Sequence, residues 1–195
     1  AEFCTAWNLD SELSATKKTL QKTLAGISRR LLHGPFNELF PCAIDPKARE
    51  LTAFRFSQAA ALAREYGATK LVLHGGFNPQ MYYRQWYVEQ SAVFWREFLA
   101  KLPEGLTVCV ENVLEPMPDM LLDILRKVDD PRLRLCLDVG HVNAYSKVPA
   151  KTWIAESGAY LSHLHIHNND SSWDTHSALF EGTLPIRELL ETAME

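Results

Sequence analysis

Short apolar runs that end in a polar residue recur five times along the chain. Their final residues are His33, His74, Glu111, Asp138 and His165. The segments between them carry apolar residues at helical spacing, so each run is predicted to be a strand that a helix joins to the next strand. Strands joined in this way run parallel and bring their carboxyl ends to one edge of the sheet. The pattern therefore predicts a parallel α/β fold in which these five side chains converge, as they would in an active site.

The predicted helices and strands alternate from one end of the chain to the other. Asp10-Ser11 can cap a first helix whose apolar positions, up to Ile27, share one face, and Asp45-Pro46 can cap the second helix. The strands are predicted at residues 30–33, 70–74, 106–111, 133–138 and 161–167, with a sixth at residues 1–4. The later helices are predicted within 78–99, at 120–128, at 152–159 and from residue 185 to the end.

The strand pattern favours a barrel over an open sheet. Thr107, Cys109 and Glu111 share one face of their strand, and small side chains give way to a functional group at its end. This is typical of a barrel interior, whereas an open sheet has helices over both faces. A closed barrel of this kind needs eight strands. We therefore expect residues 1–195 to form one barrel domain from which the first and last strands are missing.

Composition and charge exclude several classes of protein. With 47% hydrophobic and 23% charged residues, the 195-residue chain can bury a core and is not a disordered segment. Its net charge of -4 provides no global basic field for nucleic acid or anionic lipid. No signal peptide or membrane span is recognisable, so we expect a cytoplasmic protein. The four cysteines lack CxxC spacing and suit reduced thiols: Cys4, Cys42, Cys109 and Cys136.

Six short motifs occur in an order that resembles a known superfamily. They are HGPF (33–36), LHGGF (73–77), VENV (110–113), CLDVGH (136–141), HLHIHNND (163–170) and DTH (174–176), which EG follows. They resemble the xylose isomerase-like TIM barrels, which include sugar and sugar-phosphate isomerases and epimerases and the apurinic endonucleases of the endonuclease IV type (family 2). The resemblance implies a TIM (β/α)8 barrel with a divalent metal at its mouth. This chain is similar to the part of such a barrel that runs from its second strand to its seventh helix.

The resemblance makes Glu111, Asp138 and His165 the ligands of a central metal ion, with Glu111 also the candidate to move a proton. Two carboxylates and one imidazole suit Mn, Mg, Co or Zn and leave positions open for substrate oxygens. The structural alternatives are an ion pair with a helix for Glu111, a helix cap for Asp138 and a hydrogen-bonded core position for His165. In related barrels the eighth strand supplies a further glutamate.

A second set of side chains matches additional metal positions of the endonuclease-like members. This set permits a second and third metal ion, or the binding of substrate hydroxyls or phosphate as in single-metal isomerases. Capping of backbone carbonyls is a structural alternative for His33 and His74, and His163 and His167 are interpreted as hydrogen-bonding residues. The set consists of His33, His74, His141, Asp174 and His176.

Two residues depart from the superfamily pattern near the expected substrate mouth. Asn168 stands where many relatives have aspartate, and Phe180 replaces glycine in the turn before the last helix. Both departures leave the substrate class open. An aromatic run could form a lid that stacks on substrate, or it could pack in the core, as helical spacing favours. The run comprises Phe77, Tyr82, Tyr83, Trp86 and Tyr87.

These features together predict an isomerase or epimerase that acts on a small sugar or sugar-like substrate through an enediolate. The alternative is a zinc-dependent phosphodiester hydrolase of the apurinic endonuclease type, for which nucleic acid would be the partner. The acidic charge balance and the lack of a Lys/Arg-rich loop count against this alternative. A non-catalytic remnant is a third interpretation. No membrane partner is expected, and the sequence leaves the oligomeric state open.

Overall fold

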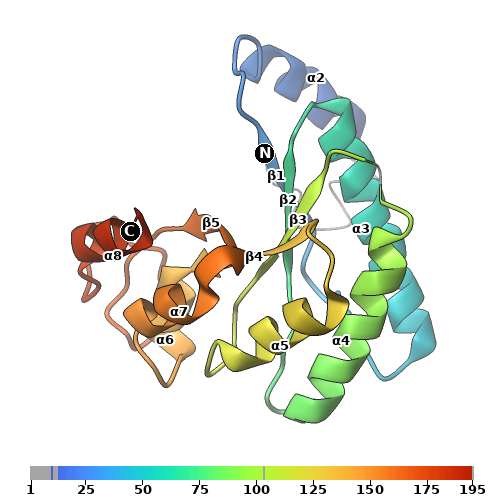
Figure 1. The fold of residues 1–195 in the computed structure, drawn as a ribbon. Helices are drawn as coiled ribbons and strands as arrows, with labels where there is room; N and C mark the ends of the chain where they lie inside the picture. Colours follow the sequence, from blue (N-terminus) through green and yellow to red (C-terminus); the bar gives the residue numbers. More distant parts are fainter. Residues whose placement is uncertain (1–9, 11–12, 103, 195) are drawn as a thin grey trace.

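The five predicted strands form one parallel sheet that curves as half of a barrel (Figure 1). The computed structural model describes residues 10, 13–102 and 104–194. The predicted strand at residues 1–4, the Ser11 cap and Cys4 lie outside the described residues. The strands lie side by side in chain order: β1 (Leu31–His33), β2 (Lys70–His74), β3 (Thr107–Glu111), β4 (Leu133–Asp138) and β5 (Leu161–His165).

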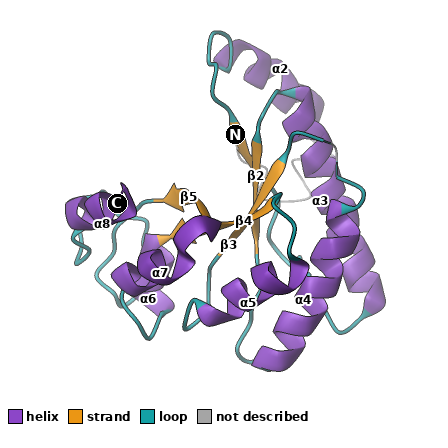
Figure 2. Cartoon of the chain, in the orientation of Figure 1, coloured by secondary structure: helices purple, strands orange, loops and turns teal. Residues whose placement is uncertain are grey.

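Helices follow the strands and cover the outer face of the half-barrel (Figure 2). Their bounds are α2 (Leu13–Thr23), α3 (Pro46–Glu65), α4 (Arg84–Leu99), α5 (Asp119–Val128), α6 (Val139–Tyr145), α7 (Ala150–Ser157), the 3-10 turn η1 (Gly158–Tyr160) and α8 (Ile186–Met194). α3 packs on β1 and β2, α5 packs on β4 and on α4, and α6 to α8 gather around β4 and β5. The parallel α/β architecture predicted from the sequence is confirmed.

The alternation of side chains along each strand separates the two faces of the sheet. Outward-facing Leu71 and Leu73 are fully buried beneath the helices in the main core. Inward-facing Val72, Cys109 and Cys136 form a second, small core inside the half-barrel. The metal-capable residues that end the strands have this inward parity, so the pleat directs all of them to the interior of the barrel.

Asp45 begins α3 as the sequence predicts. Its carboxylate accepts a hydrogen bond from Lys47 N at 2.7 Å, and Pro46 occupies the first helical position, where no backbone donor is needed. The helix buries a face of mostly small residues against the strands, including Ala59 and Ala63. The Asp45 cap therefore fixes the start of α3, the helix that covers β1 and β2.

Asp45→Ala is expected to lower the free energy of unfolding by about 1 kcal/mol, because the amide of Lys47 would lose its acceptor. Urea denaturation followed by circular dichroism measures this difference. Asp45→Asn is the matched control, since asparagine caps helices as well as aspartate does. Equal losses for the two variants would mean that the charge of Asp45, and not its capping oxygen, stabilises the helix.

Three details of the sequence prediction were wrong. The first helix ends at Thr23, so Ile27 lies beyond it and is 44% exposed. The last strand ends at His165 and not at residue 167, because the chain turns at Asn168 to pair with Ser177. α6 was not predicted, since its seven residues are too few to show a helical period.

Two further expectations concern the cysteines and a membrane span. Cys42, Cys109 and Cys136 are free and buried, as expected for reduced thiols. Within the described segments, no helix combines the length and apolar character needed to cross a membrane.

Candidate metal centre

The strand ends meet at the mouth of the half-barrel. Parallel pairing sets His74 opposite Glu111 and Asp138 opposite His165, and His33 reaches the same edge from β1. A cleft of about 710 Å³ opens over these residues, and Phe36 and Val113 supply part of its apolar wall. The predicted convergence of the five strand ends is therefore what the structure shows.

Glu111 lies at the centre of this edge and is almost completely buried. Its Oε1 lies 2.8 Å from His165 Nδ1, and its Oε2 lies 2.9 Å from His33 Nε2 and 3.6 Å from His74 Nε2. Burial alone would raise the pKa of Glu111, but its close contacts with the imidazoles of His165, His33 and His74 outweigh burial and hold the pKa well below its usual value. Glu111 is therefore an ionised carboxylate surrounded by imidazoles, and not the partner of a helix.

His74 is held in its neutral form. Burial lowers the pKa of His74 to about 4, and the nearby carboxylate of Glu111 offsets this only in part. Phe36 stacks on the imidazole with ring centroids 4.3 Å apart. A neutral imidazole is the form that binds a metal, so His74 is already prepared as a ligand.

Two histidines, in their neutral form, direct an unprotonated nitrogen at a carboxylate. His33 Nδ1 lies 2.8 Å from Gly34 O, and His141 Nδ1 lies 2.8 Å from Asn112 O. A carbonyl only accepts, so both Nδ1 atoms carry the proton and both neutral rings leave Nε2 without one. His33 Nε2 nevertheless faces Glu111 at 2.9 Å, and His141 Nε2 faces Asp174 at 3.2 Å. Lone pairs that face each other require a proton or a metal cation between them.

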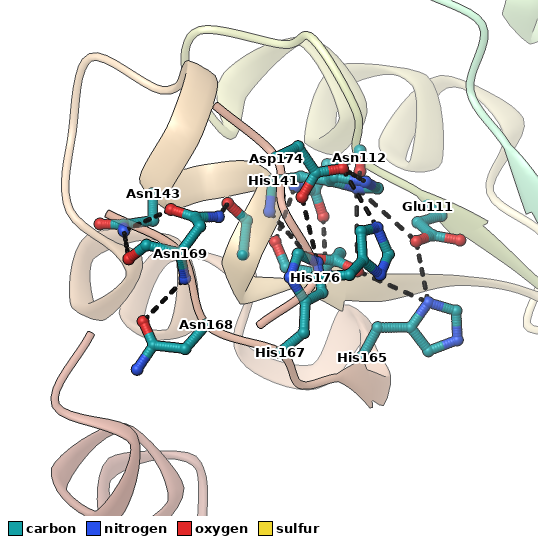
Figure 3. A network of polar contacts seen from close by, with 12 residues as sticks. Glu111, Asn112, His141, Asn143, His165, His167, Asn168, Asn169, Asp174 and His176 are labelled. Carbon is teal, nitrogen blue, oxygen red and sulfur yellow. Dashed lines mark hydrogen bonds and ion pairs between the residues drawn. The ribbon is translucent and has the colours of Figure 1, made fainter. Parts of the chain in front are cut away.

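A second cluster lies beside Glu111 and His165 (Figure 3). We call it the rim group, and it consists of His141, His167, Asp174 and His176. The rings of His167 and His176 stack with centroids 3.8 Å apart. His167 Nε2 lies 3.0 Å from Asp138 Oδ1, but Nδ1 of His167 and Oδ1 of Asp174 are buried without a hydrogen-bond partner among the described residues. Buried polar atoms without partners are costly, and a bound cation would satisfy them.

Asp138 has two roles at the start of α6. Its Oδ1 accepts a hydrogen bond from His141 N at 2.8 Å, so it caps the helix, as one sequence alternative proposed. Its Oδ2 lies 3.8 Å from His165 Nδ1 and 3.8 Å from His141 Nδ1. Asn112 holds this end of β4 in place, because its side chain donates to Asp138 O and accepts from Asp138 N. The cap therefore uses Oδ1 and leaves Oδ2 directed toward His165 and His141.

The donor atoms fit a divalent metal. Ligand atoms bound at about 2.1 Å from one ion lie roughly 3 to 3.5 Å apart, close to the 2.8 to 3.2 Å between the nitrogens of His165, His33 and His141 and their nearest carboxylate oxygens. Among the described residues, the potential ligand atoms form overlapping sets within 4.8 Å of one another. Cys136 belongs to one set, but burial and the nearby Glu111 raise the pKa of this thiol well above its usual value, which disfavours the thiolate that binds metals.

The structure brings together all eight side chains singled out from the sequence. Glu111, Asp138 and His165 form what we call the central group, and His33 and His74 adjoin it through Glu111. His141, Asp174 and His176 lie in the rim group together with His167, which the sequence interpretation treated only as a hydrogen-bonding residue. His167 lies next to these side chains because the strand stops at His165. Asn112 was missed, although it directly follows Glu111.

The residues that depart from the superfamily pattern do not line the cleft. Asn168 is 1% exposed and turns away from the cleft into the loop that follows it, whereas Phe180 is 87% exposed. The aromatic run divides as its helical spacing predicts. Tyr83 is exposed, Trp86 donates from Nε1 to Cys42 O, and neither lines the cleft. The other three are buried in the core: Phe77, Tyr82 and Tyr87.

Glu115 is a buried carboxylate outside the metal-capable groups. It accepts hydrogen bonds from Tyr87 Oη at 2.6 Å and from Val113 N at 2.7 Å, which hold the loop after β3. Burial raises the pKa of Glu115, and these hydrogen bonds offset the effect only in part. An acid with a raised pKa in the fold contributes stability below its ordinary pKa, and that contribution is lost as the pH rises through the raised value.

Glu115→Gln removes this titration, so the stability of the variant relative to the wild type is expected to increase as the pH is raised from the ordinary pKa of a glutamate, about 4.3, toward neutral pH. Urea unfolding at several pH values measures the difference between the two proteins. Glu97→Gln replaces an exposed carboxylate on α4 and is the control. A difference between wild type and Glu115→Gln that stays constant across this range would contradict the prediction.

Comparison with known proteins decides the family. A family profile described as "Xylose isomerase-like TIM barrel" matches residues 4–194. The chain belongs to this family. One curated relative of this xylose isomerase-like chain is the uncharacterized protein MJ1311 of Methanocaldococcus jannaschii, with 28% identity over 180 residues. The match covers 85% of the chain and 60% of the relative, so the chain spans less than two thirds of that protein's length.

Solved structures share the fold of this family member. A D-tagatose 3-epimerase-like protein superimposes with a TM-score of 0.80 and 23% identity, over 95% of this chain and 73% of that chain. The TTHB071 protein from Thermus thermophilus, in a crystal soaked with ZnCl2, superimposes with a TM-score of 0.77 and 25% identity, over 100% of this chain and 78% of that chain. The chain therefore corresponds to about three quarters of the length of each of these two proteins.

Proposed function

We propose that this chain is a divalent-metal-dependent isomerase or epimerase of a small sugar or sugar-like substrate. Glu111, Asp138 and His165 would hold the metal, which we expect to be Mn, Mg, Co or Zn. The observation that carries the proposal is the ionised, buried carboxylate of Glu111, which faces the Nε2 of His33 across 2.9 Å although the other ring nitrogen of His33 donates to Gly34 O. That arrangement requires a proton or a metal cation between the two atoms, and the carboxylates and imidazoles around it suit a divalent metal.

The residues of the cleft suit the chemistry of adjacent carbonyl and hydroxyl groups. A bound divalent metal supplies a Lewis acid that polarises substrate oxygens. His33 and His74 reach the same cleft and can bind substrate hydroxyls. Glu111 is ionised at neutral pH, so it can accept the carbon-bound proton whose removal gives an enediolate. Its low pKa makes it a weak base, so we expect its role as a ligand to dominate.

The comparisons support a sugar-like substrate through the family and the shared fold. One of the similar structures is described as D-tagatose 3-epimerase-like, and at 23% identity this likeness concerns the fold. The cleft of about 710 Å³ is large enough for a small sugar and has one aromatic wall, Phe36, beside its polar floor. The organisation of residues 1–195 as one domain and the cytoplasmic location remain predictions.

Phosphodiester hydrolysis is the second candidate, because the rim group gives the centre more ligands than one metal needs. His33, His74 and Glu111 form one set of ligand atoms, and the rim group forms another. Two or three zinc ions held in this way could activate water and stabilise a leaving oxygen. The net charge of -4 argues against nucleic acid as the partner.

Solvent exchange separates the two reactions. The protein, loaded with Mn²⁺, Co²⁺, Mg²⁺ or Zn²⁺ in turn, is incubated in D₂O with a panel of ketohexoses and pentuloses, and NMR follows deuterium incorporation next to the carbonyl carbon. In parallel, it is incubated with an oligonucleotide that contains an abasic site. We expect metal-dependent deuterium incorporation into at least one ketose. Cleavage of the oligonucleotide without exchange into any sugar would replace this proposal with the hydrolase.

A further inference from the structure

The rim group depends on a loop that two asparagines hold in place. We call residues 170–184 the rim loop, and it carries Asp174 and His176. His176 has a left-handed backbone (φ 50°), which is unfavourable for a residue with a β-carbon, so the surrounding contacts must hold this conformation. Those contacts begin at Asn168 and Asn169, directly after His167, and Figure 3 shows both residues beside the rim group.

Asn168 uses its whole carboxamide to close the rim loop. Its Nδ2 donates to Leu179 O at 2.9 Å and to Leu184 O at 3.2 Å, and its Oδ1 accepts from Leu184 N at 3.0 Å. Its backbone exchanges two hydrogen bonds with Ser177, directly after His176. The side chain is 1% exposed, so water cannot replace these contacts. Asn168 therefore joins both ends of the loop segment that follows His176.

Asn169 extends the same attachment to α6. Its Nδ2 donates to Gly140 O at 2.8 Å, and its Oδ1 accepts from Asn143 Nδ2 at 2.7 Å. Gly182 packs so closely that an added β-carbon would lie 2.2 Å from Asn168 Oδ1. The loop, the asparagine pair and the helix that carries His141 are thus one tightly packed unit.

We propose that Asn168 is a positioning residue for the rim group and that its amide, and not a carboxylate, is required to hold Asp174 and His176 beside His141. The inference rests on the proposed metal binding. An aspartate at this position would only accept hydrogen bonds, and one of its oxygens would face two carbonyl oxygens. Repulsion in a buried site would open the loop and separate the ligands of the rim group. Within the described part of the chain, none of the hydrogen bonds of this amide reaches the central group, so that group would keep its metal.

Titration of Zn²⁺ against a chromophoric chelator tests this proposal, because it counts the Zn²⁺ sites and measures their affinities. We call sites formed by the rim group the rim class and sites formed by the central group the central class. Asp174→Asn identifies the rim class, and Glu111→Gln identifies the central class. Asn168→Asp is expected to weaken the rim class by about 10- to 100-fold and to leave the central class unchanged. Asn78→Asp is the matched control, because the side-chain oxygen of Asn78 accepts from Gln80 N and an aspartate preserves that bond.

Gly182→Ala keeps the proposal testable if Asn168→Asp does not fold. The β-carbon of the alanine would push the side chain of Asn168 away from the rim loop without adding charge. Thermal melts of the metal-free variants report folding. The inference is overturned if Asn168→Asp binds Zn²⁺ as the wild type does, or if both classes weaken equally. A wild type with only the central class would overturn it and leave the proposed function intact. A wild type that bound no Zn²⁺ would overturn this inference, and one that bound none of Zn²⁺, Mn²⁺, Co²⁺ and Mg²⁺ would overturn the proposed function as well.

Discussion

Replacing Glu111 by glutamine is expected to weaken divalent-metal binding by more than about 100-fold and to abolish turnover. Loss of a residue that only hydrogen-bonds to a metal ligand already lowers metal affinity by about 10- to 100-fold, and loss of a ligand should lower it further. Glu111 is the residue that joins His165 on one oxygen with His33 and His74 on the other. The amide of glutamine is uncharged and presents a donor where a metal needs an acceptor. No other carboxylate among the described residues contacts both His33 and His165.

Competition titration with Mn²⁺ and Zn²⁺ measures this loss, and circular dichroism establishes that the variant is folded. Glu97→Gln removes the same charge from an exposed position on α4 and should bind metal as the wild type does. If Glu111→Gln retained wild-type metal affinity, Glu111 would be only a hydrogen-bonding partner of the histidines, and the central group would have to be reassigned.

Gly140→Ala is expected to have the second largest effect. A β-carbon at this position would lie 2.0 Å from His167 Cε1 and 2.3 Å from His167 Nδ1, far inside contact distance. Replacing glycine by alanine inside a helix normally stabilises it by about 1 kcal/mol, but overpacking here should instead cost about 1 to 3 kcal/mol. Because His167 would have to move, the rim group should also lose affinity for Zn²⁺.

Urea unfolding of the metal-free protein, together with Zn²⁺ titration, tests both effects of Gly140→Ala. The double variant Gly140→Ala/His167→Ala separates the clash from other causes, because the alanine has room once the ring is gone. Relative to His167→Ala alone, the added substitution should be neutral or stabilising. A destabilisation that persisted in the absence of the His167 ring would mean that the helix backbone, and not the packing of His167, requires glycine.

The strand ends were predictable from the sequence because they depend on local physics. A period of two along an apolar run fixes which side chains face inward, and helical connections fix the parallel direction, so the convergence of His74, Glu111 and Asp138 follows from these two rules. The cap at Asp45 was predictable for the same reason, since Asp-Pro starts a helix through contacts within one turn.

The rim group was only partly predictable because it depends on contacts between distant segments. The sequence shows three alternating histidines, and nothing local indicates that the strand stops at His165, so His167 was placed on the wrong element. The stop comes from Asn168, which bonds to Leu179 and Leu184, and from Asn169, which bonds to Gly140. α6 escaped prediction because its cap, Asp138, also ends a strand and its seven residues show no clear period.

The most direct test of a metal held by Glu111, Asp138 and His165 is an anomalous difference map from crystals of the full chain, freed of metal and then soaked in Mn²⁺. We expect a peak within bonding distance of Glu111 Oε1, Asp138 Oδ2 and His165 Nδ1, because the two oxygens already lie 2.8 Å and 3.8 Å from that nitrogen. No peak at saturating Mn²⁺, or a peak only at other residues, would contradict this assignment.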